Sequence, residues 1–176
     1  MGDERIAAYG LASARFVLRF PTRHVMAYSA HTSEQGGAVN RDEFQKLAIE
    51  RLADAKALLT MKRWAGAYYL AGYAVECGLK SCVIAYLMKT DQFPAKRFSE
   101  QCWTHDLKQL VSLAGLEADF EIARNADSDL YDNWEEVKDW SESSRYTQRT
   151  RSKAELLYAA IADKKHGVLS WIKGCW

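Results

Sequence analysis

Residues that interrupt regular secondary structure are scarce in this chain of 176 residues. Only two prolines, Pro21 and Pro94, are present, and ten glycines are spread thinly along the sequence. Because proline and glycine mark the turns between short strands, their scarcity favours long helices and an all-α fold. Uninterrupted apolar runs are also short compared with the roughly 20 residues that a membrane helix requires, so we expect a soluble protein with no membrane contact.

An excess of charge of one sign is absent as well, since 24 Lys and Arg residues balance 23 Asp and Glu residues. A protein that binds nucleic acid through its whole surface is usually strongly basic, so binding of this kind would need a local patch. The four cysteines form no CxxC pair, and the four histidines are scattered. This spacing gives no zinc site and no disulfide framework. We expect reduced thiols, a cytoplasmic protein, no metal and no cofactor.

The first 39 residues differ in pattern from the rest of the chain. Residues 29–40 are polar and contain two adjacent glycines, which is typical of a linker. Residues 1–25 carry four arginines around a weak apolar stretch, and two interpretations of them stay open: a targeting signal, or an extension that precedes a start at Met26. We therefore divide the chain into an N-terminal extension at residues 1–39 and a helical domain at residues 40–176.

Helical periodicity dominates the chain from residue 40 onward. Asn40 and Glu43 have the spacing of a capping box, and apolar residues then recur every three or four positions. The next segment is apolar on most sides, which is typical of a central helix with neighbours all around it. The sequence predicts an up-and-down bundle of four to five helices. Their predicted ranges are residues 41–60, 62–89, 105–114, 128–140 and 153–176.

The later helices are predicted from the signals at their ends. Thr104 is placed to cap the helix at residues 105–114. Ser152 and Glu155 have the spacing of a second capping box, which begins a last helix that bends at Gly167. The segment between residues 141 and 150 is predicted to be a loop.

Two charge patterns mark candidate functional sites. Glu76 and Lys80 are four residues apart on the central helix. They form either a salt bridge at a partly exposed edge, or a polar pair that faces a further charged group inside the bundle or at a partner interface. In the second pattern, residues 127–142 contain seven acids and one base, whereas residues 143–154 contain four bases and no acid.

This switch from acid to base has three interpretations. It fits a solvated helix followed by a basic loop, a self-complementary dimer contact, or an anion site. Arginines before a helix N-terminus suit phosphate, and a flanking aromatic ring can stack on a base. The candidate residues for RNA or phosphate binding are Arg145, Tyr146, Arg149, Arg151 and Lys153.

Four segments resemble motifs of the HEPN domain family, in the expected order. The sequence WAGAYYLAGYAVECGLK at residues 64–80 resembles the family's signature helix, and THDLKQL at residues 104–110 resembles a helix start of the family. Residues 140–146 and 167–176 resemble its loop motif and its closing helix. The resemblance implies an all-helical homodimer, often encoded in prokaryotes beside a nucleotidyltransferase in toxin–antitoxin-type modules. It also implies, for many members, a metal-independent ribonuclease whose catalytic arginine is followed after about four to six residues by a histidine.

Arg145 stands at the position of the family's arginine, but residues 150–152 are Thr, Arg and Ser. Neither a hydroxyl nor a guanidinium exchanges protons near neutral pH as a histidine does. We therefore expect a non-catalytic binding domain that acts through dimerisation and through a partner such as a nucleotidyltransferase. Two alternatives stay open. One is a ribonuclease toxin with a degenerate motif centred on Arg145, and the other is binding of RNA or a nucleotide without cleavage.

Overall fold

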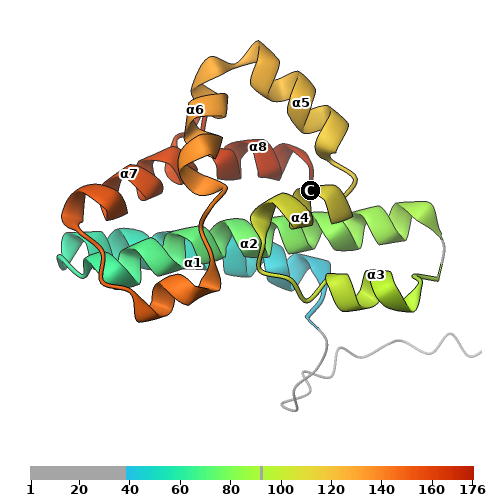
Figure 1. Cartoon of the computed structure of the whole chain (residues 1–176), viewed down its shortest axis with the longest axis horizontal. Coiled ribbons are helices and arrows are strands. Elements are labelled where there is room, and N and C mark those ends of the chain that lie inside the picture. The colour runs from blue at the N-terminus through green and yellow to red at the C-terminus, as the bar shows by residue number, and fades with distance from the viewer. Residues whose placement is uncertain (1–38, 92) are drawn as a thin grey trace, which may run out of the picture. The chain divides into compact units, whose positions relative to one another are not determined.

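The computed structural model describes residues 39–91 and 93–176, and every regular element in these ranges is a helix (Figure 1). The all-α fold class is therefore confirmed for the described part of the chain. The predicted N-terminal extension lies, apart from residue 39, outside the described residues. The helices are α1 (Arg41–Thr60), α2 (Trp64–Thr90), α3 (Lys96–Gln101), α4 (Leu107–Leu113), α5 (Glu117–Ala126), α6 (Ser128–Val137), the 3₁₀ helix η1 (Glu142–Tyr146), α7 (Arg151–Ala162) and α8 (Val168–Gly174).

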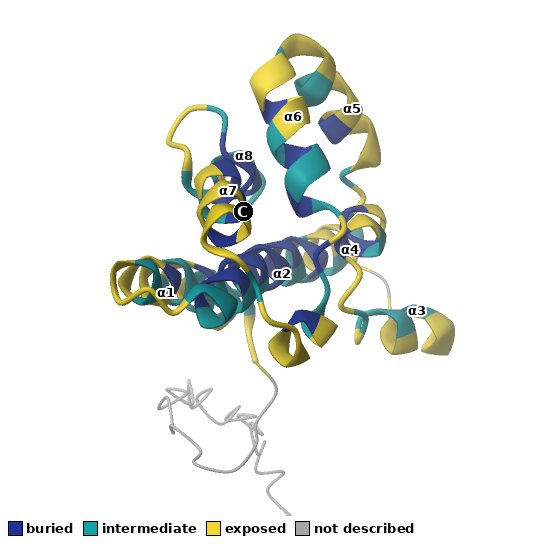
Figure 2. Ribbon diagram, turned by 60° about the vertical axis from the view of Figure 1, so that its left-hand side comes forward, coloured by how far each residue is buried: buried dark blue, intermediate teal, exposed yellow. Residues whose placement is uncertain are grey.

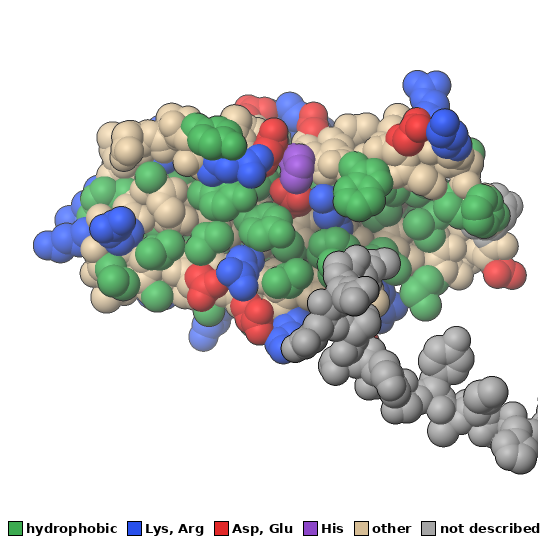
Figure 3. Space-filling model, turned by 90° about the horizontal axis from the view of Figure 1, so that it is seen from below, with side chains coloured by type: hydrophobic (Ala, Val, Ile, Leu, Met, Phe, Trp, Pro, Cys, Tyr) green, Lys and Arg blue, Asp and Glu red, His purple; other side chains and the backbone are tan. Residues whose placement is uncertain are grey.

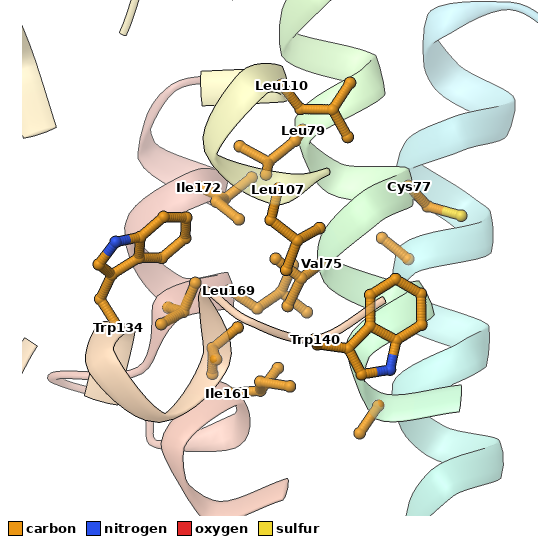
Figure 4. Close-up of a cluster of buried hydrophobic side chains, with 14 of the residues drawn as sticks. Val75, Cys77, Leu79, Leu107, Leu110, Trp134, Trp140, Ile161, Leu169 and Ile172 are labelled. Carbon is orange, nitrogen blue, oxygen red and sulfur yellow. The ribbon is translucent and has the colours of Figure 1, made fainter. Parts of the chain in front are cut away.

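Helix α2 runs through the middle of the domain and is buried over much of its length (Figure 2). It contacts α1, α4, η1, α7 and α8. Glycines allow α8 and the segment before η1 to approach α2 closely, because the space beside Gly78 is filled by Ile172 and Leu169 and the space beside Gly72 by the indole of Trp140. The predicted central helix is confirmed, and Figure 4 shows the side chains that gather around it.

The apolar character of α2 is stronger than a search for uninterrupted runs indicates. Its mean hydropathy reaches 1.3, so this helix, alone among those described, is long and apolar enough to cross a membrane. In the structure, however, 61% of that apolar stretch is buried against the rest of the protein. The core helix of a globular domain passes the same test, so length and hydropathy are weak evidence for a membrane span.

Helix α1 begins and ends with identifiable caps. The Asn40 side chain accepts a hydrogen bond from the Glu43 amide while the Glu43 carboxylate accepts one from the Asn40 amide, which confirms the first capping box. At the other end, the Arg63 amide donates to the Leu58 carbonyl at 2.8 Å, and Lys62 has a φ of 59°. This is a helix-ending turn in which lysine occupies the left-handed position that glycine adopts most easily.

Two predicted helix caps are wrong. Asp106, not Thr104, caps α4, because its carboxylate accepts from the amides of Lys108 and Gln109. Thr150, not Ser152, caps α7 by accepting from the Lys153 amide.

The last predicted helix is also interrupted rather than bent. The Asp163 carboxylate accepts from the amides of Lys165 and His166, which closes a turn between α7 and α8. A side chain on Gly167 would overlap the Asp163 backbone, so glycine is needed there.

The helices α3, α5 and η1 were not predicted, and α6 ends at Val137 instead of residue 140.

Phe120 of α5 explains how the pair α5–α6 is attached to the rest of the domain. Its ring packs edge-on against Trp134 of α6 and against Trp171 of α8, with ring centres 4.9 Å apart in both cases. Such aromatic pairs add stabilisation beyond the area that they bury.

Candidate functional site

A carboxylate buried on α2 is the centre of one candidate site. Glu76 is 1% exposed, and its Oε1 accepts a hydrogen bond from Lys80 Nζ at 2.8 Å. The same oxygen lies 2.9 Å from His105 Nδ1, while Oε2 is buried and has no hydrogen-bond partner among the described residues. Of the arrangements that the sequence leaves open, the structure has the polar pair inside the bundle, where it faces a further titratable group.

His105 comes from the segment just before α4, which the Asp106 cap holds in place. Because a carboxylate only accepts hydrogen bonds, Nδ1 is the ring nitrogen that donates to Glu76, and a neutral ring in this orientation has Nε2 as its acceptor. The side chain is 44% exposed. A histidine oriented by a buried carboxylate and open to solvent has the arrangement of a general base.

The hydroxyl and thiol groups near Glu76 are not activated. Burial is the main cause that raises the pKa of Tyr73 to about 12 and the pKa of Cys77 to about 11, and the Glu76 carboxylate raises both further. A reactive cysteine needs the opposite, a lowered pKa and access to solvent. Glu76 therefore orients His105 without an adjacent nucleophile on α2.

A cleft of about 390 Å³ lies beside His105, between the start of α4 and the segment that joins α6 to η1. An ion pair between Lys108 and Asp139, 3.0 Å from Nζ to Oδ1, spans these two parts of its wall. Its charged side chains have both signs, so the cleft has no evident preference for an anion. The lining residues are Thr104, His105, Asp106, Lys108, Lys138, Asp139, Trp140, Ser141 and Glu142.

The basic segment at residues 145–153 presents only part of its charge to solvent. Arg145 and the 83%-exposed Tyr146 lie on η1, with the guanidinium carbon 5.2 Å from the ring centre. Arg151 pairs with Glu155 at 2.8 Å, and Lys153 reaches Glu136 on α6 at 3.8 Å. The two latter charges are therefore partly neutralised by acids.

Arg149 differs from its neighbours because it folds back onto α2. Its guanidinium carbon lies 4.3 Å from the ring centre of Tyr68, and its Nε is buried with no hydrogen-bond partner. Arg151 lies over Trp64 of the same helix at 5.8 Å. The structure thus separates the predicted RNA-binding residues into an exposed pair on η1, two arginines near the start of α2 and a lysine directed toward α6.

A third group, Asp127, Asp129 and His166, brings together three side chains of metal-ligating type. The sequence analysis, which predicted no metal site, did not identify this group. Their ligand atoms lie within 4.8 Å of one another. His166 Nδ1 is 2.8 Å from Asp127 Oδ2, and this hydrogen bond is the main cause that lowers the pKa of Asp127. Asp127 also caps α6 through the Asp129 and Leu130 amides. Contacts within the protein account for this geometry, and the separation along the chain hid it from spacing arguments.

The four motif segments that resemble the HEPN family meet on α2. The second segment supplies His105 to Glu76, the third supplies Trp140 to Gly72, and the fourth places its helix against Gly78. The sequence matches no protein-family model, and neither a curated protein nor a solved structure shows significant similarity to it. Support for a function therefore comes from the geometry of the sites.

Proposed function

We propose that this chain is a HEPN-like helical domain that acts by binding, through self-association and through contact with a second protein, and that it is not an enzyme. The observation that carries the proposal is the exposed pair Arg145 and Tyr146 on a firmly held 3₁₀ helix. Trp140 and Ser144 are both buried, and the Ser144 hydroxyl donates to the Ser141 carbonyl. The backbone of η1 is therefore fixed while its two large side chains remain free to contact a partner.

The side of the domain on which η1 and α3 lie has the composition of a protein-binding face. Figure 3 views the domain from the side on which η1 and α3 lie, and hydrophobic side chains gather there among charged ones. Tyr146 of η1 is 83% exposed. Phe93 and Trp103, which lie before and after α3, are 99% and 82% exposed. Exposed aromatic side chains with charged neighbours are typical of protein interfaces.

The resemblance to the HEPN family suggests the kind of partner. It implies a homodimer and a nucleotidyltransferase within a toxin–antitoxin-type module in the cytoplasm. The convergence of the four motif segments on α2 supports the resemblance, because each segment has a packing role there. The up-and-down HEPN topology belongs to the same proposal.

Charge reversal on η1 tests the proposal. We expect Arg145→Glu and Tyr146→Ala to weaken self-association about tenfold or more in sedimentation equilibrium, because interface arginines and tyrosines often dominate the binding energy. Both variants should also lose a co-purifying nucleotidyltransferase when the tagged protein is isolated from its native host. Lys164→Glu, in the exposed turn between α7 and α8, is the control and should retain both activities. If Arg145→Glu associates and binds as the wild type does, the interface is not on η1.

The ribonuclease interpretation remains a second candidate because His105 is held by Glu76 at 2.9 Å. This histidine comes from outside the Arg145 segment, and its arrangement fits a general base. We expect a ribonuclease to cleave RNA without added metal and to lose cleavage in both Arg145→Ala and His105→Asn. Absence of cleavage by the wild type at high concentration would exclude this candidate while leaving the binding proposal intact.

A further inference from the structure

A cavity of about 500 Å³ lies where the turn between α1 and α2 meets the connection from η1 to α7. All of its charged lining residues, Lys62, Arg63 and Arg149, are basic. None of the three forms an ion pair with an acid among the described residues. The cavity therefore concentrates positive charge that the protein itself does not neutralise. The other lining residues are Leu58, Trp64, Ala65, Gly66 and Gln148.

Arg149 is the most firmly placed of the three cations. It lies 4.3 Å above the Tyr68 ring, and Tyr68 is itself buried on α2. The Nε of this guanidinium is buried and has no hydrogen-bond partner among the described residues. The group is therefore held by stacking on Tyr68, and its hydrogen-bond donors remain unused. A stacked guanidinium with free donors is the geometry in which arginine binds phosphate with two parallel hydrogen bonds.

The turn between α1 and α2 brings the other two cations to the same place. Lys62 has a φ of 59°, where glycine would cost less, so a lysine is present despite the strain. Arg63 precedes α2 and makes no side-chain cap, and the cavity is lined by the first residues of that helix. The unpaired amides of a first helical turn add favourable potential for an anion that the three cations attract.

We propose that this cavity binds the phosphate group of a nucleotide or of an RNA chain. Three cations without ion-pair partners supply the charge, and the aromatic side chain of Trp64 forms part of the wall. The site differs from the basic segment that the sequence suggests, because Lys62 and Arg63 replace Arg145 and Lys153. It is independent of the protein interface on η1 and does not require cleavage.

Removal of Lys62 and of Arg63, one at a time, tests the site. The probe is a short single-stranded RNA with a 5′-phosphate, measured by fluorescence anisotropy with the full chain at low salt. Lys62→Gly removes a charge at a position where glycine relieves strain, so the melting temperature should stay the same or rise. Arg63→Gln removes a second, exposed charge. We expect each variant to lower the affinity about fivefold or more and to reduce the salt slope by about 0.7.

Lys46→Gln is the matched control, because it removes one exposed lysine about four helical turns away on α1. It should bind the RNA within about twofold of the wild type. The same RNA with a 5′-hydroxyl, and competition by AMP, separate the two sources of phosphate. A terminal phosphate or nucleotide ligand requires the 5′-phosphate and is displaced by AMP, whereas internal phosphates bind equally well without it.

Either source supports the proposal if Lys62→Gly and Arg63→Gln weaken binding and Lys46→Gln does not. The proposal is overturned if the wild type binds none of these probes, or if all three variants bind alike. Self-association of Lys62→Gly should be unchanged in sedimentation equilibrium. Failure of the phosphate site is thereby distinguishable from failure of the protein interface.

Discussion

At the scale of single residues, Gly72 determines how closely the segment before η1 approaches the core. A methyl group at this position would overlap the indole ring of Trp140, which is 2% exposed. We expect Gly72→Ala to lower the free energy of unfolding by about 1–3 kcal/mol, because a buried tryptophan would have to move. Urea unfolding followed by circular dichroism measures this loss.

The control for this variant is Gly174→Ala, at the end of α8. No atom lies within 4 Å of the Cβ that would be added there. Alanine restricts the unfolded chain more than glycine does, so this variant should be neutral or stabilising by about 0.5 kcal/mol. Equal stabilities of the two variants would show that Trp140 does not need the space beside Gly72.

Glu76 is the other residue on which the domain depends. Glu76→Gln keeps the size of the side chain but leaves Lys80, whose side chain is 16% exposed, without its counter-charge. We expect a loss of about 2 kcal/mol in the free energy of unfolding at neutral pH, less than for a fully buried pair, because Lys80 can reach water. Urea unfolding is again the measurement.

Asp139→Asn is the matched control, since the ion pair of Asp139 with Lys108 is mostly exposed. Its loss should change the free energy of unfolding by no more than about 0.5 kcal/mol. If Glu76→Gln is as stable as Asp139→Asn, the buried carboxylate contributes nothing through its charge.

The sequence predicts the Glu76–Lys80 pair but not the contact of Glu76 with His105, and the reason is physical. Glu76 and Lys80 are one helical turn apart, so helical geometry alone brings them together. His105 lies 29 residues away, and no local pattern indicates which side chain a buried carboxylate meets across the bundle. For the same reason, the approach of Arg149 to Tyr68 and of His166 to Asp127 became visible only in the structure.

At the scale of elements, the long helices were predictable and the short ones were not. Helices α1 and α2 are 20 and 27 residues long, and apolar residues recur through both without an interrupting proline, so the signal for a helix is extensive. Helix α5 is only ten residues long and Phe120 is its one buried residue, so the apolar pattern that marks it is short. The break between α7 and α8 depends on Asp163, whose role as a turn acceptor competes with a continuous helix.

The cap of α7 gives a prediction at this scale. Thr150→Ala removes the hydroxyl that accepts from the Lys153 amide, and we expect a loss of about 1 kcal/mol in the free energy of unfolding. Ser152→Ala, two residues later and exposed inside the first turn, should change stability by less than about 0.5 kcal/mol. Chemical denaturation of the two variants in parallel distinguishes the two candidate caps. A larger loss of stability in Ser152→Ala than in Thr150→Ala would assign the cap to Ser152.

At the scale of the whole molecule, one helix joins most of the elements around the core, although α6 also packs on α7 and α8. Helix α2 contacts α1, α4, η1, α7 and α8. Detachment of any one of these elements would therefore leave the other sides of α2 covered. We therefore expect the core to open as a unit. Cys77 and Cys82 on α2 report this opening, because they are 0% and 2% exposed.

Thiol labelling with N-ethylmaleimide measures the opening. Burial is the main cause that raises the pKa of Cys77 to about 11 and that of Cys82 to about 12, so neither thiol should react in the folded state. Cys102 and Cys175 are only partly buried and should be labelled first. In a variant with Cys102→Ser and Cys175→Ser, the two core thiols should then react at one common rate, set by global unfolding.

Addition of Gly72→Ala to that variant completes the test. If opening is global and reclosing is fast, a loss of about 1.4 kcal/mol in stability raises the labelling of both core thiols about tenfold. Mass spectrometry of the two peptides gives the separate rates. Labelling of Cys77 ahead of Cys82, or rates that do not respond to Gly72→Ala, would mean that part of α2 opens locally. The domain would then consist of a stable part and a separately opening part around one helix.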